Sequence, residues 1–209
     1  MAHRENMNTN NQLGVPKTLL GMSPRELKKT IPRAYYFSFW LIPNQIDRSY
    51  FVRIINDLSC RFGAPNFEPH VTVYTGICTE KEDIKGVVLG CIAMHKVISL
   101  NVKGVACSSN LLKSLYIDFD INPVLSNMHE SISEKMKHHE HYELQPHLSL
   151  MYKNMTIRDK LIIKDQLGIR KSRVTFDGIR VVIPGNPTRG WTDVEKWKTI
   201  ITARLGNSI

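Results

Sequence analysis

The spacing of apolar residues changes along this chain between patterns typical of strands and of helices. Residues 34–42 form a dense run of aromatic and β-favouring residues that stops at Pro43, which predicts a buried strand. Apolar residues then recur at helical spacing between Ile46 and Phe62. Asn44 is placed to cap the start of this helix, and Gly63 follows its end. The first segment therefore reads as a strand followed by a helix.

A similar order of elements returns later in the chain. From Thr79 the run TEKE has the form of a capping box and predicts a second helix. Alternating apolar residues at 115–119 predict another strand, and Asn122 followed by Pro123 predicts the start of a helix that extends to Met136. The other predicted elements are strands at 97–107, 173–183 and 196–205 and a helix at 156–166.

Two short segments in the predicted strands are nearly the same, PHVTV at 69–73 and PHLSL at 146–150. Successive side chains on a strand point to opposite faces. His70 therefore shares a face with Thr72, and His147 shares a face with Ser149, while the apolar residues between them point into a core. Each segment presents one imidazole and one hydroxyl group on the same side of its strand.

The two histidine segments lie at nearly equal distances after their preceding strands, within the same order of strand, helix, histidine strand, helix and strand. We interpret this order as an internal duplication, which would bring both histidine strands to the centre of the molecule. The expected fold is α+β, with two lobes, antiparallel sheets lining a central cleft and helices outside. We expect one such unit over residues 33–209 and a loosely ordered arm over residues 1–32.

Composition narrows the class of protein only modestly. Among 209 residues, 42% are hydrophobic, and the 28 Lys and Arg against 19 Asp and Glu give a net charge of +9, which favours anionic ligands. The four cysteines form no Cys-x-x-Cys pair, as is typical of free thiols in a reducing compartment. No long apolar segment is present. We expect a cytoplasmic monomer without a membrane role.

Two imidazoles in one cleft suit paired acid and base catalysis on a phosphate ester. His70 and His147 would exchange protons with water and the leaving oxygen, and Thr72 and Ser149 would donate hydrogen bonds to the non-bridging phosphate oxygens. This scheme requires no metal and no cofactor. For a single histidine, a purely structural role would be the better interpretation, but a matched pair in matched contexts favours catalysis. A metal site at His138, His139, His141 and His147 is disfavoured because no cysteine lies at ligand spacing.

The two His-x-Thr/Ser segments and their apolar neighbours resemble the motifs of the 2H phosphoesterase superfamily, which is named for its paired histidines. More narrowly, FEPHVTV at 67–73 and PHLSLMY at 146–152 resemble the cyclic phosphodiesterase group of plants and yeasts. The resemblance spans residues 35–209. It implies a two-lobed fold and metal-independent hydrolysis of nucleoside 2′,3′-cyclic phosphates to 2′-phosphates, with ADP-ribose 1″,2″-cyclic phosphate as a further substrate.

The same resemblance assigns two more site residues. Trp40, shortly before Pro43, matches a tryptophan of the group and could stack on a base or ribose. Tyr152 matches a tyrosine that follows the second motif and could bind the phosphate. Simple alternation places Tyr152 on the opposite face from His147, so it reaches the cleft only if the strand ends or bends. Tyr74 shares the face of His70 by alternation, so it either lines the cleft or packs in the core.

Two alternatives to a nucleotide hydrolase stay open at this point. The histidine pair could act on RNA ends, as a 2′,5′-phosphoesterase, a cyclic-phosphate phosphoesterase or a ligase. The chain could also be a nucleotide-binding module without turnover. Which histidine is the acid and which the base is not decided by the residues, although the resemblance assigns the attacking water to His147 and the leaving 3′-oxygen to His70.

Overall fold

The computed structural model describes residues 34–79, 82–136, 142–184 and 191–206. The predicted N-terminal arm and the histidines at 138, 139 and 141 lie outside these ranges, so the expectations for them stay predictions.

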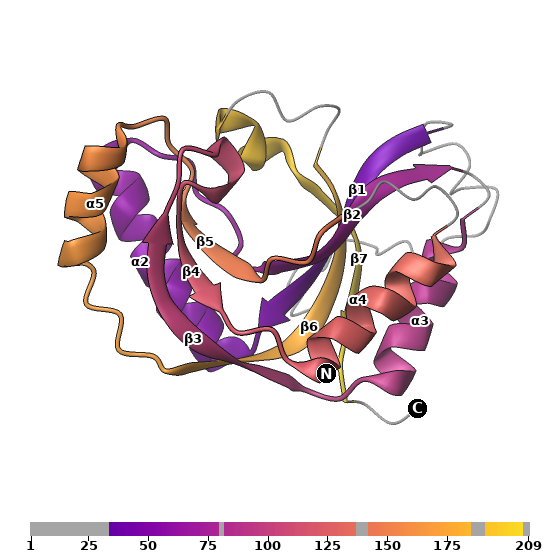
Figure 1. Ribbon diagram of the computed structural model, residues 1–209. Helices are drawn as coiled ribbons and strands as arrows, with labels where there is room; N and C mark the ends of the chain where they lie inside the picture. The colour runs from indigo at the N-terminus through magenta and orange to yellow at the C-terminus, as the bar shows by residue number, and fades with distance from the viewer. Residues whose placement is uncertain (1–33, 80–81, 137–141, 185–190, 207–209) are drawn as a thin grey trace, which may run out of the picture.

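The strands form one antiparallel sheet in the order β1-β2-β5-β4-β3-β6-β7, and an additional pairing of β1 with β6 closes the first six into a ring (Figure 1). Strand β7 continues the sheet beyond β6. The strands are β1 (Ala34–Pro43), β2 (Val71–Thr79), β3 (Ile98–Cys107), β4 (Leu115–Phe119), β5 (His147–Met151), β6 (Arg173–Ile183) and β7 (Lys198–Arg204).

Helices cover the strands from two opposite sides (Figure 1). One pair is α2 (Gln45–Phe62) and α5 (Ile157–Gln166), and the other is α3 (Ile84–Met94) and α4 (Pro123–Lys135). Two short 3-10 helices, η2 (Leu111–Lys113) and η3 (Trp191–Lys196), lie in connections between strands. The α+β class with antiparallel strands inside and helices outside is as predicted.

The element order repeats, as the sequence indicated. The first half runs β1-α2-β2-α3-β3 and the second half runs β4-α4-β5-α5-β6. Each half contributes a helix to the other, because α2 packs on β5 and α4 packs on β2. The two histidine strands meet through a single residue pair, Val71 with Leu148, which are the residues directly after His70 and His147. The duplication therefore places the two motifs side by side.

Helix ends follow the predicted caps in three places. The Asn44 side chain accepts a hydrogen bond from the Asp47 amide at 2.9 Å, and the Asn122 side chain accepts one from the Leu125 amide at 2.8 Å. Gly63 ends α2 with a φ of 59°, a left-handed conformation that favours glycine.

The predicted start of the second helix at Thr79 is wrong. Thr79 is the last residue of β2, and α3 begins at Ile84 with Asp83 as its cap. The Glu82 carboxylate does accept hydrogen bonds from the Thr79 amide at 2.7 Å and hydroxyl at 2.5 Å, as in a capping box. Pairing of Thr79 with Ala34 of β1 keeps it in the sheet, so these bonds close a turn instead of starting a helix.

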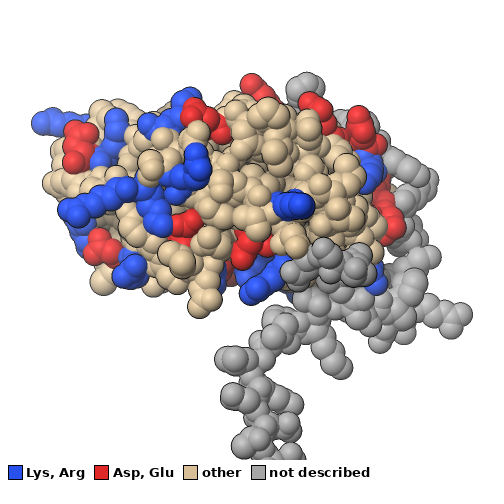
Figure 2. Space-filling view, turned by 90° about the horizontal axis from the view of Figure 1, so that it is seen from below, with Lys and Arg blue, Asp and Glu red and all other residues tan. Residues whose placement is uncertain are grey.

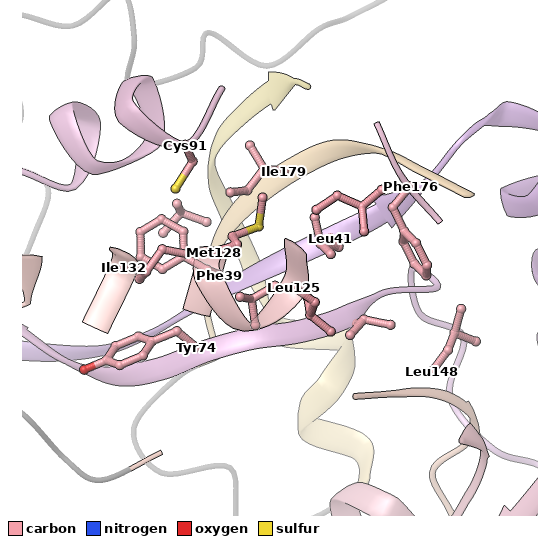
Figure 3. Close-up of a cluster of buried hydrophobic side chains, with 14 of the residues drawn as sticks. Phe39, Leu41, Tyr74, Cys91, Leu125, Met128, Ile132, Leu148, Phe176 and Ile179 are labelled. Carbon is pink, nitrogen blue, oxygen red and sulfur yellow. The ribbon is translucent and has the colours of Figure 1, made fainter. Parts of the chain in front are cut away.

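The main core lies between the sheet and the helices (Figure 3). Three buried residues of α4, Leu125, Met128 and Ile132, lie against side chains of β1 and β2, including Phe39 and Tyr74. These residues recur at helical spacing, which explains why the apolar pattern of this segment predicted its helix correctly.

Basic residues are unevenly distributed over the surface. On the face in Figure 2, Lys and Arg gather mainly toward the end of the molecule that carries α2 and α5, with acidic side chains interspersed.

In the described part of the chain, no helix has the length and apolar character needed to cross a membrane. All four cysteines are free, and only Cys60 is exposed.

Candidate active site

A cavity of about 270 Å³ opens where the two histidine motifs meet. All six residues predicted from the sequence to form the site line it: Trp40, His70, Thr72, His147, Ser149 and Tyr152. The other lining residues are Ser38, Thr75, Asn110, Leu112, Lys113, Tyr142, Glu143, Gln145, Pro184 and Trp197.

The two imidazoles are held in the same way. His70 Nδ1 lies 2.7 Å from the carbonyl oxygen of Glu68, and His147 Nδ1 lies 2.7 Å from that of Gln145. A carbonyl oxygen can only accept, so Nδ1 carries the proton in both neutral rings and Nε2 holds the lone pair. In each motif, Nε2 is therefore the nitrogen that can take a proton from a ligand or return it.

Burial makes both imidazoles weaker bases than a free histidine. Burial lowers the pKa of His70 to about 4. The hydrogen bond to the Glu68 carbonyl acts to raise this pKa, and the charge of His147 acts to lower it. Burial also lowers the pKa of His147, and Lys113 acts in the same direction. The interaction between the two rings means that a proton on one disfavours a proton on the other.

Glu68 is clamped in front of the first histidine. Its carboxylate receives a bidentate pair from Arg48, with Arg48 Nη2 at 2.9 Å from Glu68 Oε2, and Arg180 Nη1 lies 3.5 Å from the same oxygen. Although burial acts to raise it, these two cations lower the pKa of Glu68 overall. The carbonyl that orients His70 therefore belongs to a residue anchored to both α2 and β6.

A β-bulge follows each histidine motif and switches the faces of its strand. Phe39 pairs with Tyr74 and Trp40 with Thr72, which leaves Val73 as the extra residue; in the second motif Leu150 is the extra residue in the same way. Beyond the bulge, the residue five positions after the histidine faces the cavity. That residue is Thr75 in the first motif and Tyr152 in the second.

The bulges explain which way the side chains of Tyr152 and Tyr74 point, a question that simple alternation left open. Tyr152 lines the cavity despite its odd spacing from His147. Tyr74 is buried in the core with its ring 5.9 Å from that of Phe37, so lining the cleft was the wrong alternative and packing the right one. The carbonyls of Val73 and Thr72 at the first bulge contact His129 Nδ1 at 2.9 Å and the Tyr142 hydroxyl at 3.3 Å.

Aromatic rings form one wall of the cavity. The Trp40 indole stacks on the His70 imidazole with ring centroids 3.6 Å apart and planes 11° from parallel. Trp197 makes edge-on contacts with Trp40 and with Tyr152, with ring centroids 5.3 Å and 5.7 Å apart, respectively. Trp40 is only 5% exposed, whereas Trp197 is partly exposed. Trp197 therefore offers more surface to a ligand, and Trp40 mainly supports His70.

The motif hydroxyls lie on the cavity face together with a polar rim. Ser149 Oγ donates to the Leu112 carbonyl at 3.4 Å, a long bond that an incoming phosphate oxygen can replace. Burial raises the pKa of the neighbouring Tyr152 to about 12, so its hydroxyl stays a neutral donor. The rim is formed by Lys113, Gln145 and Glu143, with the Gln145 amide bonded to both of the other side chains.

Sequence reasoning missed Trp197, Lys113 and Gln145. The strand predicted at 196–205 contains Trp197, whereas in the structure β7 begins at Lys198. Trp197 also lies far from both motifs in the sequence. Gln145 occupies the position of Glu68 in the duplicated motif, two residues before the histidine, and that equivalence could have found it. Among the described residues, no group of three or more His, Cys, Asp or Glu side chains is arranged to hold a metal ion.

Comparisons with known proteins identify a family for this chain and a shared fold. The family model described as cyclic phosphodiesterase-like protein matches residues 36–203, a span that contains both histidine motifs. The chain belongs to the cyclic phosphodiesterase-like family. That membership, within the 2H phosphoesterase superfamily, supports a phosphoesterase activity.

Similar proteins agree with the assignment. A cyclic phosphodiesterase of Arabidopsis thaliana is 22% identical over 185 residues, covering 86% of this chain and 98% of that protein. The structure of Escherichia coli LigT with ATP has a TM-score of 0.54 at 9% identity and covers 84% of this chain and 100% of LigT. LigT with 3′-AMP gives 0.54 at 10% identity over 83% of this chain and 99% of LigT. At this identity, the solved structures show that the fold is shared.

Proposed function

We propose that this member of the cyclic phosphodiesterase-like family hydrolyses nucleoside 2′,3′-cyclic phosphates to nucleoside 2′-phosphates. One imidazole takes a proton from the attacking water, the new P–O bond forms, the bond from phosphorus to the 3′-oxygen breaks, and the other imidazole protonates that oxygen. Each turnover leaves the two histidines with exchanged protonation states, and exchange with water restores them.

The observation that carries this proposal is the matched support of two imidazoles around one cavity. Both Nδ1 atoms donate to a main-chain carbonyl at 2.7 Å, which leaves two Nε2 atoms in one site for the two proton transfers of an in-line displacement. Thr72 and Ser149 are available to donate to the non-bridging oxygens, and Tyr152 adds a third neutral hydroxyl.

The aromatic wall supports a nucleoside as the part of the substrate that carries the cyclic phosphate. The partly exposed ring of Trp197, beside Trp40 and Tyr152, provides a surface for a base or ribose. We keep the family-implied stacking role of Trp40 in a restricted form, since one of its faces is already covered by His70. ADP-ribose 1″,2″-cyclic phosphate remains a second proposed substrate.

For the order of the two histidines, we propose that His147 activates the water and His70 protonates the leaving oxygen. The low pKa of His70 describes the ligand-free site, and the negative charge of a bound phosphodiester would favour its protonated form. Replacing the acid should hurt least when the leaving oxygen needs no proton. On a phosphodiester with a nitrophenol leaving group, we expect His70→Ala to keep a larger fraction of the wild-type rate than His147→Ala. A larger fraction for His147→Ala would mean that the two histidines have the opposite roles.

Phosphorus NMR of the products tests the function itself. With adenosine 2′,3′-cyclic phosphate, we expect conversion to 2′-AMP, with activity unchanged by a chelator. Formation of 3′-AMP would contradict the proposed bond cleavage. Tight binding of 2′-AMP in calorimetry without any product from a panel of cyclic phosphates would identify a binding module instead. Turnover of oligonucleotide ends alone would favour an RNA-end phosphoesterase.

A further inference from the structure

In the proposed reaction, the positive charge that the motifs supply is the protonated imidazole of the acid, which is directed at the leaving oxygen. Attack on a phosphodiester anion concentrates negative charge on the phosphoryl oxygens, and Thr72, Ser149 and Tyr152 are neutral donors. Arg48 and Arg180 lie near His70, but both are engaged with the Glu68 carboxylate. A further cation that binds the phosphoryl oxygens would therefore come from elsewhere on the cavity wall.

Lys113 is the one Lys or Arg among the described residues that line the cavity, and its side chain is partly exposed. Its ammonium lies 3.2 Å from the neutral Oε1 of Gln145 and 4.8 Å from the ring centroid of Tyr116. Within the described ranges, no carboxylate lies at salt-bridge distance from it. Glu143 also lines the cavity, but its Oε2 lies 3.1 Å from the Gln145 amide, so glutamine separates it from the lysine.

Lys113 lies next to the reacting groups of the second motif. The His147 ring is 5.4 Å from the same Tyr116 ring that the ammonium faces. Leu112, the preceding residue, has its carbonyl 3.4 Å from Ser149 Oγ. The effect of Lys113 on the pKa of His147 agrees with this proximity; Asp118, paired with Lys103 at 3.4 Å, acts on it in the opposite direction.

The turn that carries Lys113 is held firmly. Ser108 Oγ donates to the Lys113 carbonyl at 2.5 Å, and the Asn110 side chain accepts from the Leu112 amide at 2.9 Å. Lys160, a buried lysine of α5, donates to the Ser108 carbonyl at 2.9 Å. These bonds fix the backbone of Lys113, and the contacts with Gln145 and Tyr116 place its ammonium, an arrangement that favours a preorganised charge.

We propose that Lys113 is a further catalytic residue, whose ammonium binds a non-bridging oxygen of the reacting phosphate and stabilises its charge in the transition state. This inference rests on the proposed function, because it needs a cyclic phosphate between His70 and His147. It adds a cation to a site that otherwise relies on imidazoles and hydroxyl groups.

Substitution of the lysine tests the charge. We expect Lys113→Met to lower kcat/KM for adenosine 2′,3′-cyclic phosphate by ~10²-fold, mainly through kcat, and Lys113→Arg to stay within about tenfold of the wild type. Lys96→Met is the matched control, since Lys96 is exposed and does not line the cavity. Lys113→Gln provides a second neutral variant should the methionine variant fold poorly. Equal activity of Lys113→Met and Lys96→Met would overturn the proposal.

A second substrate separates the reacting phosphate from any other phosphate. For adenosine 2′,3′-cyclic phosphate bearing an additional 5′-phosphate, we expect Lys113→Met to lose the same factor as for the simple cyclic nucleotide. A loss confined to the 5′-phosphorylated substrate would show that Lys113 binds a remote phosphate and would overturn its catalytic role. If wild-type protein turns over neither substrate, the proposed function fails, an outcome distinct from failure of the Lys113 proposal.

Discussion

At the scale of single residues, His70 shows how burial controls the protonation state of an imidazole in the site. The residue is 5% exposed, its ring is stacked against Trp40, and this burial lowers its pKa to about 4. Supporting the ring by the Glu68 carbonyl fixes its orientation and tautomer. The imidazole therefore stays neutral in the ligand-free protein across the range in which a free histidine gains its proton.

This burial predicts an acid-sensitive fold. Between its ordinary value near 6.5 and about 4, the unfolded state binds a proton at residue 70 that the folded state does not. The free energy of unfolding should fall as the pH falls through this window. We expect wild-type protein to lose on the order of 2 kcal/mol more than His70→Gln between pH 7 and about pH 4.5 in urea unfolding. Equal losses in the two proteins would contradict the buried, neutral state of His70.

The two tryptophans should differ in kinetic effect. Because Trp40 packs on the His70 ring, Trp40→Ala is expected to lower kcat about tenfold or more with a smaller change in KM. Trp197 offers its ring to the ligand, so Trp197→Ala should mainly raise KM. Steady-state kinetics on adenosine 2′,3′-cyclic phosphate distinguishes the cases. A KM effect confined to Trp40→Ala would instead support base stacking on Trp40.

At the scale of elements, the sequence predicted most of the strands, helices and caps, because apolar period and cap residues act locally. Alternation also placed His70 with Thr72 and His147 with Ser149. It failed beyond the bulges, since an extra residue in one strand depends on the pairing partner and leaves no periodic signal. Tyr74 therefore turned inward and Tyr152 turned toward the cavity. Thr79 failed as a helix start for a similar reason, because its pairing with β1 is not visible locally.

The turn before β4 supports a prediction about an element. Lys160 of α5 is 3% exposed and satisfies the Ser108 carbonyl, which anchors the turn that carries Lys113. Lys160→Met should leave that carbonyl without its donor, costing about 1–3 kcal/mol in urea unfolding and lowering kcat/KM through a looser turn. Lys164→Met, on the same helix but partly exposed, is the control and should change neither. Unchanged stability in Lys160→Met would contradict this anchoring role.

At the scale of the whole molecule, the site exists because the two halves are joined face to face. The repeated element order predicted that the halves meet. They are joined by the pairings of β1 with β6, β3 with β4 and β3 with β6, and the pair Val71 with Leu148 brings β2 and β5 together directly beside the histidines. The polar rim and Trp197 come from connections between strands, whose positions depend on the closed sheet. Those residues were not found from the histidine motifs alone, although comparison of the two duplicated segments could have identified Gln145 as the equivalent of Glu68.

The central claim is that His70 and His147 act as one catalytic unit, and the most direct measurement is kcat/KM for the two single alanine variants and the double variant on adenosine 2′,3′-cyclic phosphate. Since a turnover needs both proton transfers, each single variant should lose ~10³-fold or more, and the double variant should lose about as much as either one. A single variant that keeps more than about a tenth of the wild-type value, or losses that multiply in the double variant, would contradict the account.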